Sequence, residues 1–290
     1  MFDGISCARV ALQRAGIPVD KYYASEVDKN AIAISKKNYP DIIQLGDVKC
    51  VKAENLPKID LLVAGPPCQD LSVSNKNRKG LKGERSGLFF EFVRILKEVK
   101  PRYFLVENVG SMKDEDHNII TKELGVQPIF INSKVLSVQS RPRLYWTNIP
   151  VEQPKAKSIH FESIIDFKDI RSDSRGELVK RDFPGACEEF EKEMCRLGQK
   201  YLIVHRDGKI KKDQNKSDML NCTDVGSANG WRVNLLYLGG GNLRRFNYSE
   251  AEHMQTLPVG YTEGFPARKK AIGNGWTVDV IVHILSGISE

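Results

Sequence analysis

Short apolar runs alternate with amphipathic helical stretches through the first half of the chain. The runs are bounded by Gly, Pro or polar residues, and the helical stretches place apolar side chains three and four positions apart. The predicted strands are 22–25, 42–45, 61–64 and 103–106, and the predicted helices are 8–15, 30–38 and 88–99. Strands and helices that alternate at this spacing predict βαβ units and a doubly wound α/β sheet.

The pattern changes after Pro150. Residues 151–242 are rich in Lys, Glu, Asp and Asn, show weak periodicity and contain a glycine run at 239–241. Regular patterning returns at Arg244, a helix is expected at 250–256, and a closing helix is expected at 278–285. We therefore predict a first domain over 1–150, a smaller and irregular second domain over 151–262, and a segment over 263–290 that returns to the first.

Composition narrows the class of protein. The 290 residues are 41% hydrophobic and 28% charged, which is typical of a soluble globular protein. No apolar run reaches the ~18 residues of a membrane-spanning helix, and the start lacks the basic and apolar stretches of a signal peptide. The six cysteines include no Cys-x-x-Cys pair, so we expect reduced thiols, a cytoplasmic location and no bound metal. The net charge of +7 suits a polyanionic partner without requiring one.

Polar or reactive side chains lie next to the predicted strands. The segment Gly65-Pro66-Pro67-Cys68-Gln69 directly follows 61–64, and its prolines stiffen the loop that carries the thiol. Singly, such residues are more often a turn, a solvated acid or a small buried cysteine. Strand ends of a parallel sheet meet at one edge, however, so these side chains should converge there on a ligand. The acids at the other predicted strand ends are Asp3, Glu26, Asp47 and Glu107.

The order and spacing of these motifs resemble the cytosine-C5 DNA methyltransferase family over nearly the whole chain. The matching motifs are Phe2-Asp3-Gly4-Ile5, Ser25-Glu26-Val27, Gly46-Asp47-Val48, 65–69, Glu107-Asn108-Val109, the Gln-x-Arg-x-Arg of 139–143, and Gly273-Asn274-Gly275-Trp276. The first motif, residues 87–92 and Trp276 are most similar to the de novo branch and its bacterial and phage relatives. The resemblance implies a Rossmann-like, S-adenosylmethionine-dependent methyltransferase fold, with 1–150 as the catalytic and cofactor-binding domain and 151–262 as a target-recognition domain.

The resemblance also implies a covalent mechanism. Cys68 would attack carbon-6 of a flipped cytosine as a thiolate, and Glu107 would hold and protonate N3. Arg143 would hydrogen-bond O2, while Arg141 would support the loop or a phosphate. The pKa of a free thiol is about 8.5, so nearby positive charge or backbone dipoles must favour its ionisation. Activated carbon-5 would then take the methyl group of S-adenosylmethionine without a metal.

The same resemblance assigns the binding residues. Glu26 would bind the ribose hydroxyls of the cofactor, and Asp47 would bind the adenine amino group. The other expected cofactor contacts are Phe2, Asp3, Gly4, Ile5, Val27, Val48, Pro66, Leu88, Asn274 and Trp276. The expected contacts with double-stranded DNA are Gln69, Ser72, Lys211, Arg232, Arg244 and Arg245. We expect a monomer on DNA in a bacterial or phage-infected cell.

The start of the sequence departs from the family pattern. Family members have several apolar residues before Phe-Asp-Gly-Ile, which form the first central strand, whereas this sequence starts at Met1-Phe2. We expect that strand to be truncated, with lower stability and weaker cofactor binding.

Two alternative functions stay open. An RNA (tRNA) cytosine-5 methyltransferase shares the fold and the Pro-Cys-Gln loop, although the long region after Pro150 favours DNA. A catalytically silent DNA-binding or regulatory relative is the second alternative. The presence of Cys68, Glu107 and Arg143 favours an active enzyme.

Overall fold

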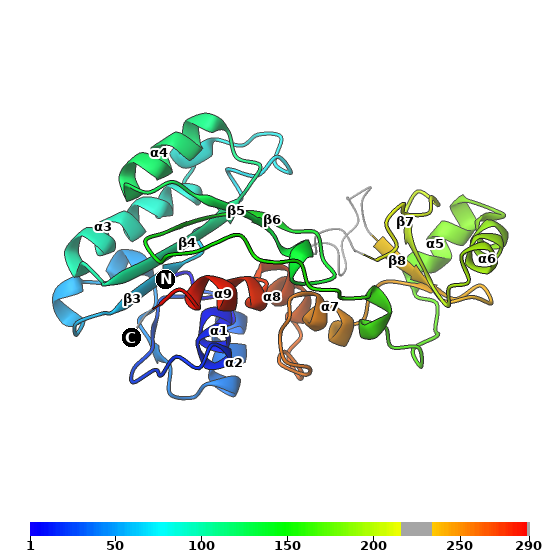
Figure 1. Cartoon of the computed structure of the whole chain (residues 1–290), viewed down its shortest axis with the longest axis horizontal. Coiled ribbons are helices and arrows are strands. Elements are labelled where there is room, and N and C mark those ends of the chain that lie inside the picture. Colours follow the sequence, from blue (N-terminus) through cyan, green and yellow to red (C-terminus); the bar gives the residue numbers. More distant parts are fainter. Residues whose placement is uncertain (216–233, 289–290) are drawn as a thin grey trace. The chain divides into compact units, whose positions relative to one another are not determined.

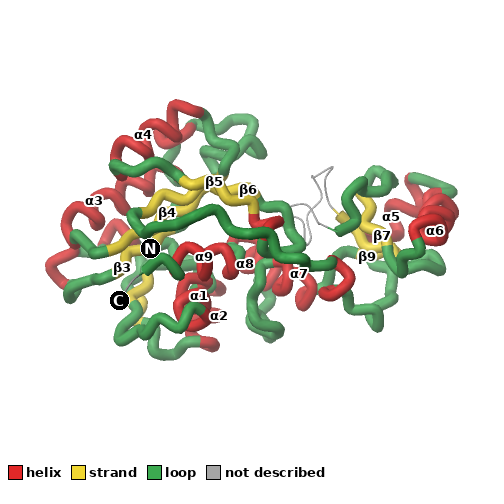
Figure 2. Tube along the Cα trace, viewed as in Figure 1, coloured by secondary structure: helices red, strands yellow, loops and turns green. Residues whose placement is uncertain are grey.

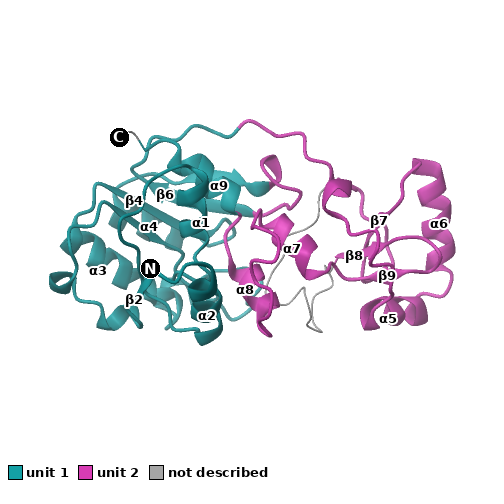
Figure 3. Cartoon of the chain, turned by 90° about the horizontal axis from the view of Figure 1, so that it is seen from below, with its two compact units in different colours: residues 1–133, 142–154, 278–290 teal, residues 134–141, 155–277 magenta. Residues whose placement is uncertain are grey.

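The structure is a computed structural model that describes residues 1–215 and 234–288. The chain divides into two compact units, shown in different colours in Figure 3. Unit 1 consists of 1–133, 142–154 and 278–290, and unit 2 of 134–141 and 155–277. The boundaries differ from the expected ones, because 134–141 and 263–277 both belong to unit 2. No helix of the described residues is long and apolar enough to cross a membrane.

Unit 1 contains two separate sheets (Figure 1). Strands β1 and β2 pair in parallel, and a four-stranded sheet has the order β3-β4-β6-β5. Strand β3 is parallel to β4, whereas β6 is antiparallel to both β4 and β5. The strand bounds are Tyr23–Ala24, Ile43–Gln44, Leu61–Ala64, Tyr103–Val109, Ile129–Asn132 and Pro142–Thr147 for β1 to β6.

Residues 1–3 hydrogen-bond to both sheets of unit 1. The amino group of Met1 donates to the carbonyl of Val63 on β3 at 2.7 Å. The N–H of Asp3 donates to the carbonyl of Ser25, just after β1, at 3.2 Å. No described strand pairs with both β1 and β3, so these two strands belong to separate sheets.

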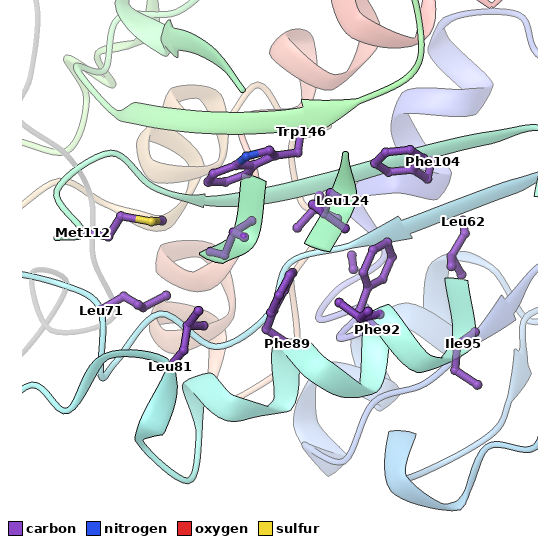
Figure 4. Close-up of a cluster of buried hydrophobic side chains, with 14 of the residues drawn as sticks. Leu62, Leu71, Leu81, Phe89, Phe92, Ile95, Phe104, Met112, Leu124 and Trp146 are labelled. Atoms are coloured by element: carbon purple, nitrogen blue, oxygen red, sulfur yellow. The ribbon is translucent and has the colours of Figure 1, made fainter. Parts of the chain in front are cut away.

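Helices cover the four-stranded sheet of unit 1. In Figure 1, α3 and α4 lie on one side of it and α1, α2 and α9 on the other. Phe89 and Phe92 of α3 are fully buried and point toward the strands, where they pack with Leu62 and Trp146 (Figure 4). This packing fixes the segment that leads into α3. The helix bounds are Cys7–Arg14 (α1), Lys29–Asn38 (α2), Phe89–Val99 (α3), Asp114–Leu124 (α4) and Val278–Leu285 (α9).

Unit 2 is built on an antiparallel sheet of order β7-β8-β9 with its own buried clusters. The elements are α5 (Ser174–Asp182), α6 (Ala186–Leu197), β7 (Leu202–His205), β8 (Asn234–Tyr237), β9 (Leu243–Arg244), α7 (Tyr248–Met254) and α8 (Arg268–Asn274). Weak periodicity predicted an irregular segment here, yet Figure 2 shows α5 and α6 as regular helices. Helix α5 buries only Gly176 and Val179, which explains its faint apolar pattern.

Short 3₁₀ turns connect several of these elements. They are Val48–Cys50, Ala53–Asn55, Gly80–Lys82, Ser86–Leu88, Ser133–Val135 and Phe161–Ile164.

Candidate active site

The strand register of unit 1 brings three candidate catalytic residues to one region. Ala64 at the end of β3 pairs with Val106, so the chain enters the Cys68 loop beside Glu107. Strand β4 continues to Val109, which places Glu107 inside the strand rather than after it. Arg143 of β6 pairs with Val109 in the antiparallel ladder. Its Nε lies 2.5 Å from Oε1 of Glu107, and the two side chains are only 8% and 11% exposed.

The backbone of the Cys68 loop is held by hydrogen bonds. Asn108, the neighbour of Glu107, is buried and donates its Nδ2 to the carbonyl of Pro66 at 3.3 Å. The carbonyl of Cys68 accepts the N–H groups of Leu71 and Ser72 at 3.0 and 2.9 Å. Cys68 as a whole residue is partly buried and packs against the core of unit 1. A cysteine that is not fully buried and has a fixed backbone is the arrangement that nucleophilic catalysis needs.

Arg141 lies in unit 2 and supports a different segment. It is buried, and its Nη2 donates to the carbonyls of Gly273 and Gly275, each at 3.1 Å. These two glycines flank Asn274, one of the expected cofactor contacts. Of the two roles expected for Arg141, the bonds favour support of a loop over contact with a phosphate.

The carboxylate of Glu26 lies just after β1 and accepts three backbone N–H groups. Its Oε2 accepts from Gly4 at 2.8 Å, and its Oε1 accepts from Val27 and Asp28 at 2.8 and 2.9 Å. A carboxylate offers about four acceptor sites, so Glu26 keeps capacity for a ligand hydroxyl. Gly4 has a φ of +57°, and an added Cβ there would meet nothing within 4 Å. These features fit the ribose of S-adenosylmethionine.

Asp47 follows β2, the parallel neighbour of β1. Its side chain is exposed, and its Oδ1 accepts the N–H of Lys49 at 3.0 Å, which caps a 3₁₀ turn. Arg94 of α3 donates to the carbonyls of Val48 and Val51 at 3.3 and 3.0 Å and holds this turn. Arg94 was missed from the sequence, because a charge on an amphipathic helix is ordinarily solvated. The 3₁₀ turn that Arg94 holds carries an acid, Asp47, and a buried apolar residue, Val48. This combination suits an adenine ring.

Asp3 is bonded within unit 1. It accepts hydrogen bonds from Tyr22 Oη at 2.6 Å and Ser6 Oγ at 2.5 Å. Burial raises the pKa of this carboxyl. The hydrogen bonds of Asp3 with Tyr22 and Ser6 therefore order the residues around Gly4.

The other expected cofactor contacts differ in exposure. Val27 is 66% exposed, whereas Ile5 and Val48 are buried. Phe2 and Leu88 are half-buried, and Pro66 is buried. Asn274, exposed, and Trp276, half-buried, belong to unit 2.

The expected DNA contacts are divided between the two units. Gln69 is exposed and Ser72 half-buried on the Cys68 loop, where Ser72 Oγ accepts the N–H of Ser74 at 3.2 Å. Lys211 is half-buried in the turn that follows β7. Arg232 lies outside the described residues.

Arg244 requires a correction, because the structure uses all its donors inside unit 2. Nε donates to the carbonyl of Asp169, Nη1 to Glu250 and the carbonyl of Arg245, and Nη2 to Glu250 and the carbonyl of Asp166. A guanidinium has five N–H groups, and these bonds account for all of them. Arg244 is 3% exposed, so it is a structural residue and not a phosphate contact. Its neighbour Arg245 is paired with Asp173 at 2.5 Å.

No cluster of three or more His, Cys, Asp or Glu side chains suited to a metal occurs within 1–215 and 234–288.

Comparison with known proteins gives the family. The chain matches the C-5 cytosine-specific DNA methylase family over residues 1–290. It is 34% identical over 196 residues to the orphan methyltransferase M.SPRI of Bacillus phage SPR, covering 63% of this chain and 44% of that protein. It is 30% identical over 175 residues to the type II methyltransferase M.NgoBV of Neisseria gonorrhoeae, covering 53% of this chain and 41% of that protein. The chain thus spans less than half the length of these two curated relatives.

Solved structures share the fold. The Entamoeba histolytica methyltransferase EhMeth superposes with a TM-score of 0.72 at 16% identity, covering 99% of this chain and 95% of that one. The S. pombe Dnmt2 methyltransferase gives a TM-score of 0.66 at 19% identity, with coverage of 98% and 95%. The family match over residues 1–290 shows that the chain belongs to the C-5 cytosine-specific DNA methylase family.

Proposed function

We propose that this protein is an S-adenosylmethionine-dependent DNA cytosine-5 methyltransferase that acts through a covalent Cys68 adduct. The observation that carries the proposal is the register of β3, β4 and β6. In that register the loop of the partly buried Cys68 begins beside the strand of Glu107, whose Oε1 contacts Arg143 Nε, and this supports the proposal. A nucleophile, an acid and a cation in one region suit addition to an electron-poor ring.

In the first step, Cys68 Sγ attacks carbon-6 of cytosine as a thiolate and forms a C–S bond. The electron pair of the 5,6 double bond moves into the ring, and Glu107 donates a proton to N3. Arg143 donates to O2 while its Nε holds Glu107 in place. Carbon-5 thereby becomes an enamine-like nucleophile.

In the second step, carbon-5 bonds to a methyl group. When bound, S-adenosylmethionine supplies that group as an electrophile and leaves as S-adenosylhomocysteine. Loss of the carbon-5 proton to a solvent base restores the 5,6 double bond as the C–S bond breaks. Cys68 leaves as a thiolate, and Glu107 recovers its proton from N3. The sum is cytosine and S-adenosylmethionine in, and 5-methylcytosine, S-adenosylhomocysteine and one proton out.

Double-stranded DNA is the proposed substrate, and unit 2 is the proposed target-recognition part. A stacked cytosine cannot reach the thiol, so the base must be flipped out at a cost of a few kcal/mol. The net charge of +7 favours approach to DNA. The family name and the type II relative favour DNA over RNA as the substrate. We place the protein, as a monomer, in bacterial or phage DNA modification.

Covalent trapping tests this proposal. Duplex DNA that carries 5-fluorocytosine cannot release its fluorine in place of the carbon-5 proton, so the enzyme stays attached. With S-adenosylmethionine present, the wild-type protein should give an adduct on a denaturing gel, and Cys68→Ala should give none. Folded wild-type protein without an adduct would support the silent-relative alternative. Tritium transfer into tRNA instead of duplex DNA would support the RNA alternative.

A further inference from the structure

Ser86 is hydrogen-bonded on both sides of the nucleophile. Its Oγ donates to the carbonyl of Pro67, the residue before Cys68, at 2.8 Å. The same oxygen accepts the N–H of Asp70, two residues after Cys68, at 3.2 Å. Ser86 is fully buried and opens the 3₁₀ turn that leads directly into α3. One hydroxyl therefore spans the turn that carries the thiol.

The side chain of Asp70 completes a reciprocal arrangement. Its Oδ2 accepts the N–H of Ser86 at 3.3 Å, while its own N–H donates to the Ser86 hydroxyl. Asp70 is 7% exposed, and Arg85 lies 3.7 Å from its Oδ1. A buried carboxylate requires such partners, so the two residues fix each other.

The absence of a side chain at Gly83 leaves room for the Asp70 carboxylate. A Cβ added to Gly83 would lie 2.5 Å from the Asp70 carboxyl carbon, so any larger residue would displace it. The carbonyl of Asp70 also accepts the N–H of Gly80 at 2.9 Å. Glycine at position 83 allows the loop to close on Asp70.

We propose that Ser86 is a positioning residue for Cys68 and that Asp70 holds Ser86 in that role, an inference that rests on the proposed function. Phe89, three residues after Ser86, is buried in the core of unit 1, so the hydroxyl is attached to a rigid element. Without it, the Pro67 carbonyl and the Asp70 N–H lose a shared partner. The thiol then spends less time in the geometry that attacks carbon-6. Misplacement of a reacting atom by about 1 Å can cost ~100-fold in rate.

The test separates positioning from simple stabilisation. Ser86→Ala is compared with Ser74→Ala, which alters an exposed serine on the same loop. Each protein is assayed well below its melting temperature for single-turnover trapping by 5-fluorocytosine DNA, with kcat and the Kd of S-adenosylmethionine measured in parallel. We expect Ser86→Ala to lower the trapping rate and kcat by about 10- to 100-fold, with cofactor Kd within about twofold. Ser74→Ala should match the wild type.

Each other outcome has a defined meaning. If Ser86→Ala melts at a lower temperature yet traps at the wild-type rate, the positioning role is wrong and Ser86 is only structural. If the wild type itself gives no adduct, the proposed function fails before the role of Ser86 is reached. Should Ser86→Ala not fold, Asp70→Asn serves instead, because it keeps the shape but weakens the acceptor for the Ser86 N–H. It should trap more slowly by a factor of about 3 to 10, and an unchanged rate would overturn the proposal.

Discussion

Two buried arginine–glutamate pairs, one in each unit, differ in how their atoms are bound. In unit 1, Arg143 reaches Glu107 through Nε at 2.5 Å, where the side chains are 8% and 11% exposed beside the Cys68 loop. In unit 2, Arg244 meets Glu250 through both terminal nitrogens at 2.8 Å, where the side chains are 4% and 1% exposed. The first pair joins two strands near the Cys68 loop, and the second joins β9 to α7.

The pair in unit 2 is fully engaged in hydrogen bonds within that unit. Arg244 gives every donor to protein oxygens, and Glu250 also accepts the N–H groups of Asp166 and Asn247. The bond to Asn247 is half of a capping box that starts α7. Such a pair could bind a ligand only by breaking the structure that it holds. Burial of an ion pair therefore does not by itself identify a ligand-binding site.

The largest expected effect comes from Glu107→Gln. The amide keeps the size of the side chain and an acceptor for Arg143, but it cannot donate the proton that N3 needs. The single-turnover rate of methyl transfer should fall by about 10²- to 10⁴-fold, with little change in melting temperature. Tritium transfer to duplex DNA measures the rate, and calorimetry measures the melting temperature. The contrast between the two arginine–glutamate pairs is wrong if Glu107→Gln loses stability and keeps its rate of methyl transfer per folded molecule.

The pair in unit 2 should respond in the opposite way. Arg244→Met leaves Glu250 buried without a cation, so the free energy of unfolding should fall by about 3–5 kcal/mol. Adding Glu250→Gln removes the unpaired charge and should recover part of that loss. Urea denaturation of the two single variants and the double variant measures the coupling. If Arg244→Met is as stable as the wild type but binds DNA more weakly, with a smaller salt dependence, the phosphate-contact interpretation returns.

Elements with a clear apolar pattern were predictable from the sequence. The strand Leu61–Ala64 and the helix Val278–Leu285 lie where the pattern placed them, because each is an apolar run with sharp ends. Helices α5 and α6 escaped prediction, since at least half of their residues are charged and few are buried. The extension of β4 through Glu107 was also missed, because the strand continues there by pairing with β6 across the sheet.

The candidate site was predictable only in part. Cys68, Glu107 and Arg143 were singled out by motif order, and strand register explains why they are close in unit 1. Arg244 could not be distinguished from a DNA contact, because its five bonds go mostly to backbone carbonyls that the sequence does not place. Ser86 was missed for the same reason. Its hydroxyl hydrogen-bonds the backbone on either side of Cys68, and only the tertiary fold brings these groups together.

The smallest expected effect concerns Asp173, the partner of Arg245. Its Oδ1 accepts the N–H groups of Arg175 and Gly176 at the start of α5, and its Oδ2 accepts from Arg245. Burial alone would raise the pKa of Asp173, but the hydrogen bonds from Arg245 and Gly176 outweigh it and hold the pKa below the ordinary 3.8. A carboxyl whose pKa is lower in the folded than in the unfolded protein adds to the free energy of unfolding at pH values above its unfolded-state pKa. This contribution is lost as the pH falls through the folded-state pKa.

Asp173→Asn should therefore lower the free energy of unfolding by about 0.5–2 kcal/mol near neutral pH, since Asn can still cap α5. The difference from wild type should stay constant down to about pH 5 and shrink below that, as Asp173 in the unfolded chain becomes protonated. Urea midpoints across pH measure it, with Asp182→Asn as the control because Asp182 forms an exposed pair with Arg181. A difference that persists unchanged at low pH would assign the effect to capping geometry. The charge of Arg245 would then contribute nothing to the stability of unit 2, in contrast to the charge of the buried Arg244 beside it.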